Sequence, residues 1–266
     1  MLLDKGFSLR ANFKKKNGVR AKYPERDEQF KYISSVRAKF TEEALPIISV
    51  DTKKKELIGD FKRPGRTWQK KADEVNEHDF RSLATCRAVP YGIYDVTKNI
   101  GHIFVGTSND TPKFAVDAIA HWWKIEGRQQ YPNADGILIL ADSGGSNGFR
   151  SRAWKYQLQT ELSNAFQIQV SVCHYPTGCS KWNPIEHRLF SFISINWFGK
   201  PLRTLDTMLA YIRGTSTSTG LSVKASLLDG GYEKSQRVLA KDFNQLDLRP
   251  HETHPAWNYT IYPRFS

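Results

Sequence analysis

The stretch LPIISVD, residues 45–51, determines how the rest of the chain is interpreted. Its run of branched apolar residues has the length and composition of a buried β-strand, and that strand ends in Asp51. A second stretch, GILILAD at residues 136–142, repeats the pattern and ends in Asp142. Functional residues of open α/β sheets collect beyond the carboxyl ends of the strands, so the two aspartates are the first candidates for a shared site.

A third acid, Glu186, lies in the stretch SKWNPIEH at residues 180–187. Pro184 suits the first turn of a helix, and the dipole at that end of the helix favours a carboxylate. Three such acids suit a site for two divalent ions about 3.5–4 Å apart, and oxygen-only ligands select Mg²⁺ or Mn²⁺ over zinc. Each acid also has a plainer interpretation, as a strand-end turn residue, an Asx-turn or a helix-capping charge. The metal-site prediction therefore rests on the three acids together and on the basic character of the chain.

The segments around these acids change from strand patterns to alternating strand and helix patterns. Short apolar runs predict further strands at residues 91–96, 102–106 and 167–173, and residues 56–62 are interpreted as the returning arm of a hairpin before a turn at 63–66. Helical spacing predicts helices at residues 27–40, 111–126, 151–165 and 184–197, the second capped by Thr111 with Pro112 in its first turn. This order predicts an α/β fold, with three antiparallel strands continuing into parallel ones and helices on the flanks.

The chain divides into three predicted parts. Residues 1–44 form a basic N-terminal segment, since the first 40 residues carry 11 Lys or Arg against four acids. Within this segment residues 14–20 are expected to be a solvated basic loop. Residues 45–214 are expected to form the domain that contains the three acids. Residues 215–266 are interpreted as an irregular C-terminal extension, because Ser, Thr and Gly dominate its first residues.

Composition restricts the class of partner. A hydrophobic fraction of 39% is typical of a folded core, and a formal net charge of +12 favours a polyanionic partner. No apolar run approaches the roughly 20 residues that span a bilayer, and the N-terminus lacks the apolar segment of a signal peptide. Three cysteines form no disulfide framework, which is typical of a reducing cytoplasm. The sequence therefore favours a nucleic acid over a membrane.

Basic residues near the three acids are the predicted DNA contacts. The set is Lys53, Lys54, Lys55, Lys62, Arg63, Arg66, Lys181, His187 and Arg188. Beside a metal site, the lysines directly after Asp51 would bind the backbone of a nucleic-acid strand, although such a run is also typical of a solvated face. The stretch from residue 62 to residue 71 combines basic residues with Trp68, a mixture that nucleic-acid-binding surfaces use. His187 is interpreted either as orienting a phosphate or water, or as a surface histidine.

Two further motifs are weaker. Cys173, His174 and Cys179 have no second pair nearby that would complete a zinc site, which disfavours zinc. The stretch GGSNG at residues 144–148 lacks the Lys-Ser/Thr ending of a nucleotide-binding P-loop. It is interpreted as a turn that lets a DNA strand pass close to Asp142, or as a plain connecting loop.

Three segments of the chain resemble the catalytic blocks of the Rhodopirellula-type insertion-sequence DDE transposases. They are ISVDTKKKE at residues 48–56, ADSGGSNG at 141–148 and SKWNPIEHRLF at 180–190. The NPIE block is also similar to that of the wider mariner-like group. Further similar segments are VNEHDF at 75–80, PYGIYD at 90–95 and WNYTI at 257–261. The resemblance runs from about residue 5 to the C-terminus.

The resemblance implies a ribonuclease H-like fold in which Asp51, Asp142 and Glu186 bind two Mg²⁺ or Mn²⁺ ions. It also implies transposon-end and target DNA as partners, a homodimer on the DNA, and a location on the nucleoid in the bacterial cytoplasm. The expected reaction is hydrolysis at the transposon end, followed by attack of the freed 3′-hydroxyl on target DNA. Members of the family usually begin with a helix-turn-helix region, and this chain is expected to start at its last helix.

Two rival functions stay open at this point. One is a structure-specific nuclease on the same fold, which would cut DNA but never join ends. The other is an inactive transposase remnant that binds DNA without cleaving it.

Overall fold

The two stretches that end in aspartate form neighbouring strands at the centre of the sheet. The computed structural model describes residues 24–234 and 237–264. In it, β1 (Ile47–Thr52) pairs in parallel with β5 (Gly136–Ala141), and Val50 lies opposite Ala141. The apolar residues of both strands are buried, as expected of parallel strands covered on both faces. This register brings Asp51 and Asp142 to adjacent positions at the carboxyl ends of the two strands.

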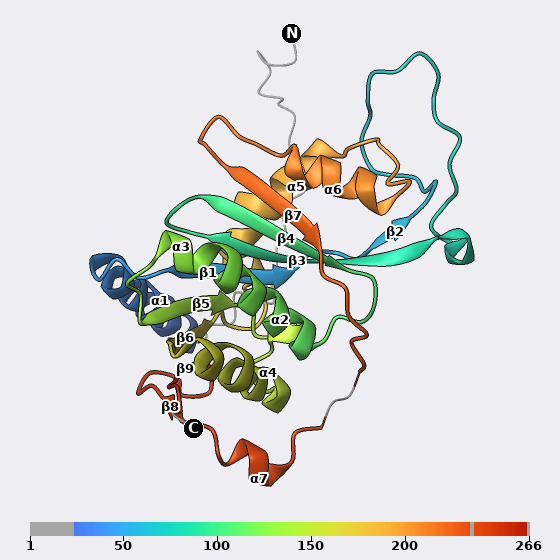
Figure 1. Cartoon of the computed structure of the whole chain (residues 1–266). Helices are drawn as coiled ribbons and strands as arrows, with labels where there is room; N and C mark the ends of the chain where they lie inside the picture. Colours follow the sequence, from blue (N-terminus) through green and yellow to red (C-terminus); the bar gives the residue numbers. More distant parts are fainter. Residues whose placement is uncertain (1–23, 235–236, 265–266) are drawn as a thin grey trace.

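The sheet has nine strands and runs in the order β7-β4-β3-β1-β5-β6-β9-β8, with β2 beside β3 (Figure 1). The other strands are β2 (Glu56–Ile58), β3 (Cys86–Asp95), β4 (Ile100–Gly106), β6 (Gln169–His174), β7 (Ser222–Leu227), β8 (Leu248–Pro250) and β9 (Asn258–Ile261). Strands β1, β3 and β4 are antiparallel neighbours, and β5 and β6 continue from β1 in parallel. The predicted fold class, three antiparallel strands followed by parallel ones, is confirmed.

The hairpin expected at residues 56–62 is wrong. Strand β2 pairs with residues 86–88 of β3 and not with β1, whose antiparallel partner is the later part of β3. The ten-residue β3 extends past the end of β1 and offers its free edge to β2. Strand β1 is the nearer neighbour of β2 in the sequence and is therefore the expected partner. The length of β3 instead allows it to pair with both β1 and β2.

The irregular structure expected after residue 215 is also wrong. Strand β7 adds in parallel to β4 at one edge of the sheet, and β9 adds antiparallel to β6 on the other side. Tyr259 and Ile261 are fully buried in the main core. These strands escape pattern recognition because β9 has only four residues and β7 is half exposed at an edge.

Helices cover both faces of the sheet (Figure 1). On one face lie α2 (Pro112–Trp122) and α4 (Arg152–Gln157), continued by the π-helical turns Trp123–Gly127 and Leu158–Asn164. On the other lie α1 (Pro24–Glu42), the π-helical turn Glu186–Phe190 with α5 (Ser191–Asn196), and α6 (Leu205–Arg213). Shorter helical turns are Arg81–Leu83, α3 (Arg128–Gln130), Gly145–Asn147, Ser180–Trp182 and α7 (Ala240–Phe243). The four predicted helices are confirmed, whereas the basic loop expected at residues 14–20 lies outside the described residues.

The strands bury alternate residues against these two layers. Ile48 and Val50 face the core beneath α2 and α4, whereas Ile47 faces the core beneath α1. Because side chains alternate along a strand, Ser49 and Asp51 share the face of Ile47. Within the described ranges, no helix is long and apolar enough to cross a bilayer.

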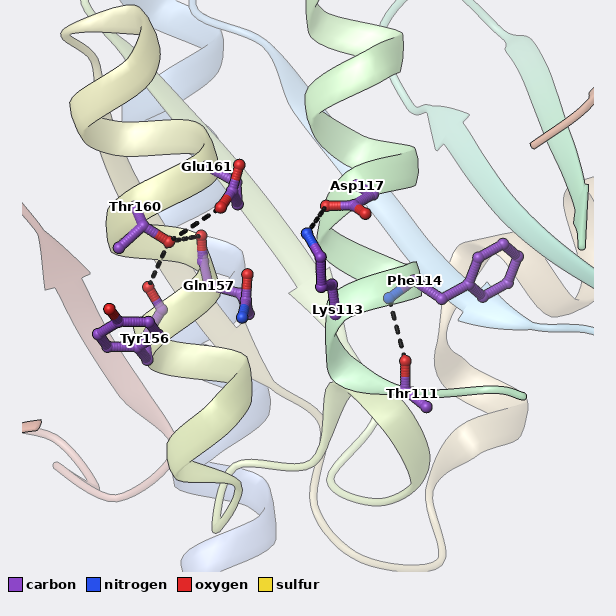
Figure 2. A network of polar contacts seen from close by, with 8 residues as sticks. All are labelled: Thr111, Lys113, Phe114, Asp117, Tyr156, Gln157, Thr160 and Glu161. Atoms are coloured by element: carbon purple, nitrogen blue, oxygen red, sulfur yellow. Dashed lines mark hydrogen bonds and ion pairs between the residues drawn. The ribbon is translucent and has the colours of Figure 1, made fainter. Parts of the chain in front are cut away.

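Helix α2 begins where the sequence predicts it. Thr111 precedes Pro112, and its Oγ1 accepts a hydrogen bond from the Phe114 N–H at 3.2 Å. Figure 2 shows this cap beside the Lys113–Asp117 ion pair, facing the helix that contains Thr160. The cap satisfies one of the free N–H groups at the start of the helix.

Replacing the cap, Thr111→Ala, should lower the free energy of unfolding by about 1 kcal/mol, the usual cost of losing an N-cap hydroxyl. Thr160→Ala is the matched control, because its hydroxyl bonds the Tyr156 carbonyl within a helix and caps nothing. Urea denaturation of both variants measures the difference. Equal losses in the two variants would show that Thr111 does not act as a cap.

Candidate metal centre

The structure brings the three predicted acids together at one end of the sheet. Asp51 lies near the end of β1, Asp142 directly follows β5, and Glu186 begins a helical turn. Asp51 and Asp142 line one cleft of about 320 Å³, and Asp51 also lines a neighbouring cleft of about 320 Å³. Glu186 lies close enough to Asp51 for its charge to raise the pKa of the Asp51 carboxyl group.

The electrostatics of this cluster are unfavourable when no cation is present. Burial raises the pKa of Asp51 well above its ordinary value, and the charges of Asp142 and Glu186 raise it further. The Thr52 N–H, 2.7 Å from Asp51 Oδ1, opposes the effect. Burial raises the pKa of Asp142 to about 6, with the Glu186 charge adding to it and the Asn183 amide opposing it. Carboxylates that resist ionisation together are stabilised when a cation compensates their charge.

These acids fit a hard divalent cation by their chemistry. All three offer oxygen donors, the ligands that Mg²⁺ and Mn²⁺ prefer. No group of three or more His, Cys, Asp or Glu side chains within residues 24–234 and 237–264 is preassembled to hold a metal ion. The fit therefore rests on donor type and charge, and their role as metal ligands stays a prediction.

A chain of buried hydrogen bonds fixes the backbone of Asp142. Trp154 Nε1 donates to the Tyr259 hydroxyl at 2.9 Å, and that hydroxyl lies 3.1 Å from His174 Nε2. His174 Nδ1 lies 2.9 Å from the Asp142 carbonyl. Because a carbonyl only accepts, Nδ1 carries the hydrogen and Nε2 accepts from the Tyr259 hydroxyl. Both ring nitrogens are thus engaged, which leaves neither free for the disfavoured zinc site with Cys173 and Cys179.

Helix α1 supports the loop that leads from His174 to the third acid. Gln29 donates to the His174 carbonyl at 2.9 Å and exchanges two hydrogen bonds of 2.7 Å with Asn258. Phe30 packs against Tyr175 and Trp182, with ring centroids 6.0 Å apart in each pair. The helix of the predicted basic segment therefore packs directly behind the site.

The predicted DNA contacts separate into buried and exposed groups. Lys53 and Arg63 are buried, and both pair with Glu56, with Lys53 Nζ 3.9 Å from Glu56 Oε1. Lys55 Nζ lies 3.2 Å from Asp110 and is partly buried. The other predicted contacts are exposed: Lys54, Lys62, Arg66, Lys181, His187 and Arg188. DNA binding by any of these residues stays a prediction.

Sequence patterns missed several residues around the acids. Arg87 is exposed on β3 and lines the same cleft as Asp51 and Lys54. Its neighbours in the sequence form an ordinary strand, so no signal marks it. His174 and Tyr259 were also missed as supports of Asp142, because they meet only when β6 and β9 pair. The WNYTI stretch, which resembles the family, is the one signal that points to Tyr259.

Solved structures of Mos1 transposase share this fold. The paired-end complex with the left transposon end has 10% identity and a TM-score of 0.51, covering 79% of this chain and 59% of that chain. The strand transfer complex has 11% identity and a TM-score of 0.52, covering 79% and 58%, and the pre-cleavage transpososome has 9% identity and a TM-score of 0.52, covering 79% and 60%. This chain thus matches about three fifths of the length of those chains. No curated protein matches the chain.

The sheet order and these likenesses define the class: a ribonuclease H-like domain of the kind found in DDE transposases. The family model of the Rhodopirellula transposase DDE domain matches residues 1–263. The chain therefore belongs to that family of transposase domains, and the resemblance drawn from its three acidic blocks is confirmed.

Proposed function

We propose that this chain is the catalytic part of a transposase that cleaves DNA strands at insertion-sequence ends and joins them to target DNA. The proposal rests on the closeness of Asp51, Asp142 and Glu186. Their negative charges repel one another, and bound cations would compensate that repulsion. Membership of the DDE family over residues 1–263 supports it, and so does the likeness to Mos1 transposase in its paired-end complex with a transposon end and in its strand transfer complex.

Asp51, Asp142 and Glu186 would hold two Mg²⁺ or Mn²⁺ ions. When bound, such a pair activates the attacking oxygen and stabilises the leaving oxygen of the phosphodiester. The carboxylates themselves hold the ions and do not attack phosphorus, so no covalent enzyme–DNA intermediate forms. Water is the first nucleophile, at the transposon end, and the freed 3′-hydroxyl is the second, at target DNA.

The DNA strand would approach over the Gly144–Gly145 turn. A Cβ atom added at either glycine meets no atom within 4 Å, so this side of the acids is open. Exposed cations flank the opening, with Lys54 and Arg87 lining the cleft of Asp51. Lysine and arginine side chains of this kind would contact phosphates and so position the strand without reading its sequence.

We also infer that the protein acts as a homodimer on DNA, in the bacterial cytoplasm. Cross-linking in the presence of DNA tests the dimer.

The double variant Lys54→Gln/Arg87→Gln should weaken DNA binding and flatten its salt dependence. Each lost phosphate contact lowers the slope of log K against log salt by about 0.9, so we expect a slope smaller by about 1.8. Fluorescence anisotropy with a labelled duplex at several salt concentrations measures both quantities.

The matched control for this test is Lys124→Gln/Arg128→Gln. It removes the same two positive charges from exposed residues in the helical turns that follow α2. These turns lie at the opposite end of α2 from Asp110 and the three acids. Identical salt slopes in the two double variants would contradict a DNA path over the Asp51 cleft.

A plasmid assay separates the proposed function from its rivals. The chain is incubated with Mn²⁺ and a supercoiled plasmid that carries the element's ends, and products are scored for nicks and for joined ends. A transposase gives both, and a structure-specific nuclease gives nicks without joining. DNA binding without either product would identify an inactive remnant and overturn the proposal.

A further inference from the structure

The side chain of Asn183 lies fully buried between the segments that carry the three acids. Its Nδ2 group donates to the Val50 carbonyl at 3.2 Å and to Asp142 Oδ1 at 3.1 Å. Its Oδ1 accepts a hydrogen bond from the Ser49 hydroxyl. One amide therefore uses both of its hydrogens and its oxygen to tie β1 to Asp142.

Ser49 extends this connection to the third acid. Its Oγ accepts a hydrogen bond at 3.0 Å from the N–H of Ile185, the residue before Glu186. This N–H belongs to the first turn of a helix, where no carbonyl of the helix is available to it. A hydroxyl of the central strand thus caps the helix of Glu186, two residues before Asp51 on the same face of β1. The Asn183 carbonyl adds a second restraint, because it accepts from the Glu186 N–H at 3.1 Å.

The orientation of the amide excludes Asn183 itself as a metal ligand. The only acceptor atom of its side chain, Oδ1, is turned toward Ser49, and the side-chain donor group faces Asp142. Asn183 therefore acts on Asp142 by donating to it, and the Asp142 carboxylate keeps further lone pairs for a cation. Groups that orient a ligand in this way govern how tightly a metal binds.

We propose that Asn183 and Ser49 are positioning residues that set the separations of Asp51, Asp142 and Glu186 and thereby the affinity for divalent ions. The proposal rests on the proposed function, because it assumes that these acids hold the ions. Every acid lies within one residue of a hydrogen bond made by this pair: Val50 precedes Asp51, Asp142 is bonded directly, and Ile185 precedes Glu186.

Mn²⁺ binding by the purified chain tests the proposal without measuring activity. Free Mn²⁺ is followed by electron paramagnetic resonance for the parent, Ser49→Ala and Asn183→Ala, and thermal midpoints are recorded alongside. We expect Ser49→Ala to weaken Mn²⁺ binding about tenfold and Asn183→Ala by about tenfold to a hundredfold, the range for groups that orient metal ligands.

Ser171→Ala is the matched structural control. The buried Ser171 hydroxyl lies 2.8 Å from Thr260 Oγ1 between β6 and β9, and it touches none of the acids. This variant should lose thermal stability to a similar extent as Ser49→Ala and bind Mn²⁺ like the parent. The proposal is overturned if Ser49→Ala keeps the Mn²⁺ affinity of the parent while its thermal midpoint falls as far as that of Ser171→Ala. The hydrogen bonds of Ser49 would then contribute to packing alone. If Asn183→Ala does not fold, Ser49→Ala alone decides the outcome.

Asp142→Asn distinguishes this failure from failure of the proposed function. If Asp142→Asn weakens Mn²⁺ binding and Ser49→Ala does not, the acids hold the ion but the positioning role is refuted. If Asp142→Asn binds Mn²⁺ like the parent, the acids are not ligands, and both proposals fall together.

Discussion

Glu186→Gln should reduce Mn²⁺-dependent nicking of supercoiled plasmid by roughly a thousandfold. Metal ions contribute several kcal/mol of transition-state stabilisation, and each 1.36 kcal/mol is a tenfold factor in rate. The amide is nearly isosteric with the carboxylate but lacks its charge, so the fold and DNA binding should be retained. Asp51→Asn and Asp142→Asn should have effects of the same order, because we propose that the three acids hold the ions jointly. The measurement is the initial rate of conversion to open-circular plasmid.

The control for these variants is Glu161→Gln, which makes the same chemical change at an exposed position on the helix after α4. It should nick at the rate of the parent and bind DNA equally well. Full nicking activity in any of the three site variants would overturn the assignment of that acid.

The second large effect concerns the stability of the metal-free chain between pH 6.5 and pH 8. Asp51 has a raised pKa in the folded state, so the folded chain binds protons that the unfolded chain has released. Stability from this source is present at low pH and is lost as pH rises through the folded pKa. The unfolding free energy should therefore fall by about 2 kcal/mol over this window in EDTA. Asp142, whose burial raises its pKa to about 6, contributes the same trend at lower pH.

The window starts at pH 6.5 because buried histidines act in the opposite direction below it. Burial lowers the pKa of His102 and of His174 to about 4, so stability from these two residues rises with pH up to their unfolded value of about 6.5. Above pH 6.5 these histidines no longer contribute, so a stability that falls with pH identifies the carboxylates.

Chemical denaturation at several pH values, with and without Mn²⁺, measures this effect. Asp51→Asn should remove most of the fall in the metal-free protein, and Asp229→Asn, at an exposed position, should leave it unchanged. Mn²⁺ should stabilise the parent more at pH 8 than at pH 6.5, because the ion binds deprotonated carboxylates. A metal-free stability that rises with pH in the parent and in Asp51→Asn alike would contradict the electrostatic description of the site.

The central strands and the three acids could be predicted because their signals are local. Residues 137–141 are a continuous apolar run and residues 47–50 are apolar except for Ser49, and such runs mark strands buried on both faces. The two aspartates follow these runs directly, and the order of the strands places them together. Pro184 likewise marks the start of the helix of Glu186 by its own covalent geometry.

The parts that could not be predicted depend on long-range pairing. Strand β7 joins β4 across more than a hundred residues of sequence, and its half-exposed pattern carries no signal of its own. The ion pairs of Lys53 and Arg63 with Glu56 could not be predicted from a run of basic residues either, because the surrounding fold determines which of these side chains are buried. Asn183 and Ser49 lie 134 positions apart and meet only when the helix of Glu186 docks on β1.

Joint binding of two divalent ions by Asp51, Asp142 and Glu186 is the proposal on which the other predictions about the site depend. Anomalous diffraction at the manganese edge from crystals of the chain with Mn²⁺ and DNA tests it most directly. We expect two peaks about 3.5–4 Å apart among the three carboxylates, both absent in crystals of Asp142→Asn. Peaks at other residues, or none among these acids at saturating Mn²⁺, would contradict it.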